Sequence, residues 1–169
     1  MTHHRRRNNG TDPSKINETV ELSPAQRYAA FKQTQAKQRT VAAEFARSMP
    51  FELDEFQMQA NDALEAGDNV LVAAPTGAGK TVAADFAIYL AQTRNVKAFY
   101  TTPIKALSNQ KYHDLVDQYG TDKVGLLTGD TSINSEADIV VMTTEVLRNM
   151  LYEHSVTLEA LRYVILDEV

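Results

Sequence analysis

The pattern of apolar and polar positions changes character around Pro50. Residues 1–22 are polar and offer almost no side chain to bury, which predicts a disordered basic arm. From Ser23 and Pro24, a capping residue followed by a first-turn proline, apolar residues recur at helical spacing. We therefore expect one ancillary helix, within residues 23–50, that continues to about Ser48 and is ended by Pro50.

From residue 51 onward, short apolar runs alternate with amphipathic stretches. The amphipathic stretches have the length and periodicity of helices, and we place them at Glu55–Ala66, Lys80–Thr93, Lys105–Tyr119, Thr144–Tyr152 and Thr157–Leu161. The apolar runs have the length of strands, and we place them at Asn69–Ala74, Val96–Thr101, Val124–Leu127, Asp138–Met142 and Tyr163–Leu166. Strands this apolar are buried on both faces, so residues 51–169 are predicted to form an α/β domain with a parallel sheet and flanking helices.

Composition and charge narrow the classes of protein to consider. The 169 residues include no cysteine, which excludes a disulfide scaffold, a thiolate zinc site and a cysteine nucleophile. No apolar run is long enough to span a membrane, and no secretory signal follows the basic start, so a cytoplasmic protein is expected. Residues 1–50 carry nine basic and four acidic residues, whereas residues 51–169 carry eight and eighteen. A polyanionic partner would therefore need a local basic patch.

A candidate phosphate loop lies between a predicted strand and a predicted helix. Glycines let successive backbone N–H groups turn toward a phosphate, and the following helix N-terminus adds positive potential. Lys80 would reach the β- and γ-phosphates of a nucleotide, and the Thr81 hydroxyl would bind Mg²⁺. Alanine replaces the glycine that commonly opens this pattern. The loop residues are Ala74, Pro75, Thr76, Gly77, Ala78, Gly79, Lys80 and Thr81.

An acidic pair follows the last apolar run, as the second half of a nucleotide site requires. Asp167 would hold Mg²⁺ through water, and Glu168 would orient and deprotonate the attacking water. An acidic pair after a strand is by itself usually a solvated turn. Together with the glycine loop, it indicates a site that hydrolyses a nucleotide.

Five motifs in order resemble those of a known family. They are Ala74–Thr81, Thr101–Tyr112, Gly125–Asp130, Thr143–Arg148 and Leu166–Val169. The region from Phe51 onward is similar to the first RecA-like domain of superfamily-two helicases. It most resembles the DEVH-box RNA helicases of the superkiller and exosome-associated type and their bacterial HelY-type relatives. The resemblance implies ATP with Mg²⁺, single-stranded RNA as partner, and a connection to RNA-decay machinery.

The resemblance also implies roles for residues outside the phosphate loop. Gln57 would read the adenine edge with its amide, and Phe51 would stack on the base or only staple the first helix to the sheet. Nucleic-acid contacts would come from strand ends and helix starts that lie at one edge of the sheet, where helix caps and phosphate contacts use the same N–H groups. The residues concerned are Pro103, Lys105, Gln110, Gly129, Asp130, Thr144 and Glu145.

The family pattern further implies a histidine after Val169, a second RecA-like domain, and a strand between the two nucleotide-site strands. Residues 51–169 would thus be an incomplete first helicase domain, and the isolated chain is expected to lack activity because helicases close two domains around ATP. Alternatives remain open: another phosphate-loop enzyme, a non-catalytic nucleotide-binding module, or a helicase that acts on DNA. RNA-stimulated turnover would distinguish the helicase from the first two.

Overall fold

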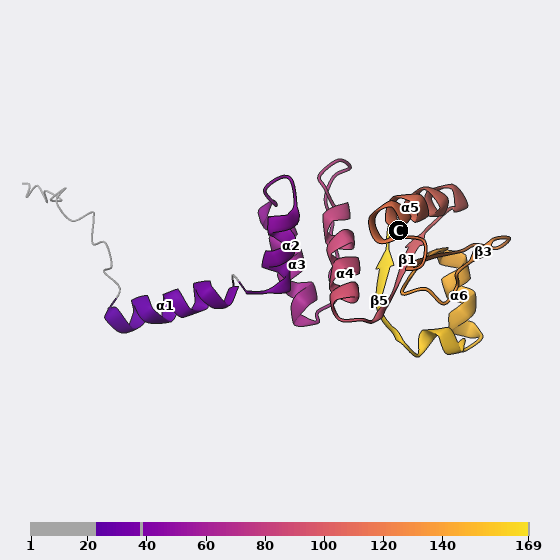
Figure 1. Cartoon of the computed structure of the whole chain (residues 1–169). Coiled ribbons are helices and arrows are strands. Elements are labelled where there is room, and N and C mark those ends of the chain that lie inside the picture. Colours follow the sequence, from indigo (N-terminus) through magenta and orange to yellow (C-terminus); the bar gives the residue numbers. More distant parts are fainter. Residues whose placement is uncertain (1–22, 38, 169) are drawn as a thin grey trace, which may run out of the picture. The chain divides into compact units, whose positions relative to one another are not determined.

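The computed structural model describes residues 23–37 and 39–168 (Figure 1). The predicted basic arm, residues 1–22, lies outside these residues. Helix α1 (Pro24–Lys37) belongs to one unit, and Arg39–Val169 forms a second compact unit that contains every other element. Two exposed aromatic residues, Tyr28 and Phe31, lie on α1.

The ancillary helix is broken in two, so the prediction of one helix to Ser48 is wrong. A second helix, α2 (Val41–Ser48), begins after Thr40, whose hydroxyl accepts a hydrogen bond from the Ala43 N–H at 3.1 Å. The Glu65 carboxylate accepts from the first N–H groups of α2, at 2.9 and 2.7 Å. These acceptors satisfy N–H groups that a continuous helix would have paired internally. The structure therefore groups α2 with the body and not with α1.

The body is built on a sheet of five strands in the order β3-β2-β4-β1-β5. Strands β2, β4, β1 and β5 are parallel neighbours, and the short β3 pairs with β2 in antiparallel fashion. The carboxyl ends of the parallel strands therefore share one edge. The strands are β1 (Lys97–Thr102), β2 (Val124–Leu127), β3 (Ser132–Ile133), β4 (Ile139–Thr143) and β5 (Leu161–Leu166).

Helices cover both faces of this sheet, as the sequence predicted for an α/β domain. One face carries α4 and α5 over a core that includes Tyr100 and Leu115, whereas α6 covers the other face near Phe99. Helix α2 packs against α4, with the Phe45 ring 5.2 Å from the Phe86 ring. The helices are α3 (Glu55–Ala66), α4 (Thr81–Thr93), α5 (Lys105–Tyr119) and α6 (Thr144–Tyr152).

Two predicted elements of residues 51–169 differ from the structure. Residues 69–74 form no strand, because no strand within the described part of the chain lies beside them to complete a ladder; Leu71 is 89 % exposed. The predicted helix Thr157–Leu161 is only a short 3₁₀ turn, Val156–Leu158, because Leu161 already pairs with β1 as part of β5.

Strand β5 is also less buried than the sequence implied. Its residues alternate between half-buried and exposed, with Val164 45 % and Leu166 52 % exposed. Only β1 pairs with it among the described strands, so its other edge carries unpaired backbone groups. None of the described helices is long and apolar enough to cross a membrane.

Candidate functional site

The glycine loop has the backbone geometry that a phosphate cradle needs. Gly77 and Gly79 adopt φ angles of +83° and +78°, a region that glycine enters without steric cost. A Cβ on Gly79 would lie 2.5 Å from the Gln57 side-chain nitrogen. Both this close approach and the positive φ therefore exclude larger residues at position 79. Ala74, which replaces the usual first glycine, has no positive φ and therefore needs none.

This loop contains the Lys80 ammonium and several backbone N–H groups that donate to no carbonyl oxygen of the described residues. The Lys80 ammonium donates to the carbonyl oxygens of Ala74 at 2.7 Å and Pro75 at 3.2 Å, so the side chain folds back over the loop. Helix α4 starts immediately afterwards, at the exposed Thr81. Free N–H groups at a helix start, beside an ammonium, match the chemistry of a phosphate. Within the described residues, the backbone N–H groups without a carbonyl acceptor include those of Gly77, Gly79, Lys80 and Thr81.

Gln57 connects the first helix of the body to the loop. Its side-chain oxygen accepts from the Asp54 N–H at 2.8 Å, and its amide nitrogen donates to the Gly79 carbonyl at 3.0 Å. The side chain is buried, yet each end of the amide keeps one further hydrogen-bonding position. Phe51, the predicted stacking partner, is 51 % exposed, so its ring is not fully covered by α3.

Replacing Gln57 with alanine should reduce the preference for ATP over GTP by about 3- to 10-fold, the value of a neutral hydrogen bond. Competition binding with the two nucleotides measures this ratio. The matched control is Gln59→Ala, since Gln59 lies on the same helix and bonds only to Glu55 there. An unchanged ratio for Gln57→Ala would make this residue purely structural.

The acidic pair follows β5 at the same edge of the sheet as the ends of β1 and β4. The Asp167 N–H donates to the Thr101 carbonyl at 3.0 Å, and one Asp167 carboxylate oxygen accepts from the Tyr100 hydroxyl at 2.5 Å. Burial, first, and the hydrogen bond to Asp167 raise the pKa of Tyr100 well above its ordinary value, so this hydroxyl stays protonated. Glu168 is exposed and has a φ of +55°.

A cavity of about 420 Å³ opens at this edge beside the ends of β1, β2 and β4. Five of the seven residues that were predicted to touch nucleic acid line this cavity. Gln110 and Thr144 do not line it: Gln110 lies further along α5, and the Thr144 hydroxyl donates to the Thr102 carbonyl at 3.2 Å. The lining residues are Pro103, Ile104, Lys105, Thr128, Gly129, Asp130, Thr143 and Glu145.

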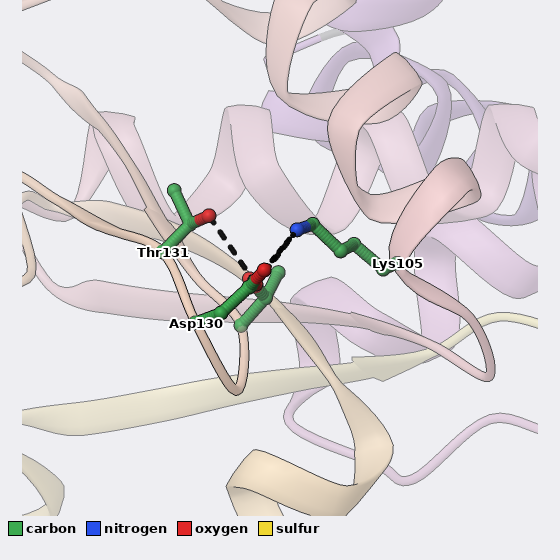
Figure 2. Close-up of polar contacts among 4 residues, drawn as sticks. Lys105, Asp130 and Thr131 are labelled. Carbon is green, nitrogen blue, oxygen red and sulfur yellow. Dashed lines mark hydrogen bonds and ion pairs between the residues drawn. The ribbon is translucent and has the colours of Figure 1, made fainter.

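Two of these lining residues, Lys105 and Asp130, form an ion pair (Figure 2). The Lys105 ammonium lies 2.7 and 2.6 Å from the two carboxylate oxygens of Asp130. Thr128 and Thr131 donate to the same carboxylate. The hydrogen bond from Lys105, followed by that from Thr128, lowers the pKa of Asp130. Both charged side chains are largely exposed, so a phosphate can compete for Lys105.

The first turn of α5 supplies further donors to this cavity. Ile104 precedes the helix and provides no side-chain cap, and the first backbone bond of the turn runs from the Ser108 N–H to the Ile104 carbonyl. The N–H groups before Ser108 are therefore available to a ligand. An uncapped helix start beside a lysine suits a backbone phosphate of a nucleic acid.

Sequence reasoning did not single out Tyr100 or Thr128. Tyr100 lies in the middle of an apolar strand, where it resembles a core residue, and only its buried hydroxyl signals a need for a polar partner. Thr128 follows β2 and donates to Asp130, two positions later in the same loop. The bond from Tyr100 to Asp167 joins two elements that are distant in the sequence, which no local pattern reports.

A glycine loop at a helix start, in a domain whose parallel sheet has an acidic pair at the end of a strand, is typical of phosphate-loop nucleotide-binding domains. Residues 54–169 match the model of the DEAD/DEAH box helicase family, and the chain belongs to that family. The predicted family resemblance and α/β fold are thus confirmed.

Individual relatives support the same assignment. The chain is 61 % identical over 125 residues to a probable helicase HelY of Mycobacterium tuberculosis, a match that covers 74 % of the chain and 14 % of that protein. It is 54 % identical to superkiller complex protein 2 of Mus musculus over 70 % of the chain and 9 % of that protein. The chain thus spans only a small part of these relatives.

A solved structure shares the architecture. The crystal structure of a hypothetical ATP-dependent RNA helicase from Sulfolobus tokodaii aligns with a TM-score of 0.55 and 28 % sequence identity. The alignment covers 75 % of this chain and 40 % of that chain. The likeness covers most of the chain, in agreement with the predicted RecA-like fold.

Proposed function

We propose that this chain is the ATP-binding and RNA-binding part of an ATP-dependent RNA helicase. The observation that supports the proposal is that donors suited to phosphate lie both in the glycine loop and at the start of α5 beside Lys105. The glycine loop and Asp167 would form one site, and the cavity around Lys105 would form the other. A protein that couples ATP hydrolysis to movement along a strand needs both ligands within one domain.

In the nucleotide site, the loop from Ala74 to Thr81 would hold the phosphates and Gln57 would contact the adenine, with Phe51 beside it. Thr81 and Asp167 are oxygen ligands suited to Mg²⁺, which in such sites keeps several waters and binds few protein groups. The ion would neutralise charge on the phosphates, and Glu168 would accept the proton of the attacking water.

In the second site, a backbone phosphate would take the Lys105 ammonium from Asp130 and bind the free N–H groups of α5. Asp130 would not contact the phosphate, since a carboxylate repels it. Its role would be to position Lys105 and its own loop before the phosphate binds. Gly129 leaves that loop open, as no atom lies within 4 Å of a Cβ built there. Contacts of this kind carry little base information, so we propose sequence-tolerant binding.

Three narrower statements complete the proposal. Residues 51–169 would correspond to part of the first RecA-like domain. The protein would act in the cytoplasm, and its partners would include RNA-decay machinery, because the similar mouse protein is named for a superkiller complex. A helicase that acts on DNA and a non-catalytic nucleotide-binding module are the competing functions.

The test of the function is ATP turnover by the protein at its natural length, with and without nucleic acid. We expect single-stranded RNA to stimulate hydrolysis more strongly than single-stranded DNA of the same sequence. Equal or greater stimulation by DNA would assign a DNA helicase, and ATP binding without turnover would assign the non-catalytic module.

Replacing Lys105 with alanine should weaken RNA binding and reduce the slope of log affinity against log salt by about one, because one phosphate contact is lost. Fluorescence anisotropy at several salt concentrations measures both quantities. Lys123→Ala is the matched control: its side chain is 45 % exposed, against 47 % for Lys105, and it also pairs with an aspartate. Lys123 precedes β2, at the opposite edge of the sheet. Equal effects of the two substitutions would exclude the cavity as the RNA site.

A further inference from the structure

A buried polar cluster behind Asp167 has no role in the function proposed above. Tyr100 is 1 % exposed, and its hydroxyl donates to one Asp167 carboxylate oxygen. The Lys111 ammonium lies 4.9 Å from the centre of the Tyr100 ring and 2.9 Å from an Asp85 oxygen. These four residues come from β1, α5, α4 and the end of β5, so the cluster links four elements that are separate in the sequence.

Asp167 is consequently held at two points. Its backbone N–H is bound to Thr101 of β1, and its side chain is bound to the next residue back along the same strand. A hydroxyl that occupies one carboxylate oxygen prevents rotation of the group and leaves the other oxygen for a water or a cation. A phenylalanine at position 100 would fill the core equally well but could not do this.

The rest of the cluster keeps the phenol in place. Lys111 lies over the ring, an attraction that strengthens when the cation is shielded from water, and its side chain is only 14 % exposed. Asp85, one turn after Thr81 on α4, neutralises that ammonium. The helix that begins at the phosphate loop is thus tied to the residue that holds Asp167.

We propose that Tyr100 is a positioning residue that orients the Asp167 carboxylate toward the Mg²⁺ of the bound nucleotide. This inference rests on the proposed nucleotide site. Loss of such an outer contact typically weakens metal affinity by 10- to 100-fold without removing the ligand itself.

The test is Tyr100→Phe in the protein at its natural length, with Tyr119→Phe as the matched control. Tyr119 is half-buried on α5, and its hydroxyl accepts a hydrogen bond from the Gln118 amide at 3.3 Å and makes none with Asp167. Calorimetry should give the same ADP affinity as wild type in EDTA, whereas the gain in affinity on adding Mg²⁺ should shrink by about 10-fold or more. The Mg²⁺ concentration for half-maximal ATP turnover should rise by a similar factor, and excess Mg²⁺ should restore turnover. Tyr119→Phe should change neither quantity.

A double-substitution comparison separates positioning from a general structural effect. If Tyr100 acts through Asp167, the gain in ADP affinity on adding Mg²⁺ should be the same in Asp167→Asn and in the double variant that also carries Tyr100→Phe. Additive losses, an unchanged Mg²⁺ requirement for Tyr100→Phe, or failure of Tyr100→Phe to fold would each overturn the inference. If Lys80→Ala loses nucleotide binding and Tyr100→Phe has no effect, this inference alone is overturned. If neither substitution has an effect, the nucleotide site itself is removed.

Discussion

Replacing Glu168 with glutamine is expected to abolish RNA-stimulated ATP hydrolysis while leaving ATP binding intact. Glutamine has nearly the shape of glutamate, so phosphate and metal contacts should persist. Its amide cannot accept the proton of the attacking water, and a positioned general base contributes about 10²- to 10⁴-fold to rate. Turnover should therefore fall by at least about 100-fold.

The position of Glu168 supports this expectation. It follows Asp167 directly, at the carboxyl end of β5, and its side chain is exposed. Steady-state turnover and calorimetric ATP affinity, measured on the same preparation, separate catalysis from binding. Glu159→Gln, an exposed glutamate next to the 3₁₀ turn, is the control that should leave both unchanged. Turnover retained in Glu168→Gln would mean that another residue is the base.

Replacing Lys80 with alanine is expected to weaken ATP binding by about 10- to 150-fold, since a charge-assisted bond to phosphate contributes about 1.5–3 kcal/mol. In the structure the ammonium donates to Ala74 and Pro75, two acceptors within its own loop. A phosphate would replace these neutral partners with a charged one. Removal of the side chain therefore eliminates an interaction that is much stronger with ligand than without.

Calorimetry with ATP and with adenosine distinguishes this effect from loss of fold. Adenosine carries no phosphate, so its affinity should be the same in wild type and Lys80→Ala. The Lys123→Ala protein, changed at the far edge of the sheet, should bind both ligands as wild type does. Unchanged ATP affinity in Lys80→Ala would remove the phosphate-loop assignment.

Much of the architecture was determined by the sequence alone, because its signals are local. The bounds of α3, α5, α6 and β2 agree with the predicted ranges, since capping residues, apolar periodicity and breakers act within a few residues. The glycine loop was likewise recognisable, because its spacing before a helix is a local requirement. Family membership followed from the order of such motifs.

The tertiary structure decided whatever depended on a neighbour distant in sequence. Residues 69–74 have the composition of a strand but form none, because a strand exists only beside a partner that completes its hydrogen bonds. The ancillary helix breaks before Val41 because Glu65, from another helix, binds the new N-terminus.

The same reason limits what sequence can say about the site. Gln57 and Gly79, Lys105 and Asp130, and Tyr100 and Asp167 are separated by 22, 25 and 67 positions. Each residue alone is an ordinary amide, charge or core aromatic, and its chemical role is defined by the partner. Each pair joins segments that are far apart in the sequence, so only the tertiary structure could bring the partners together.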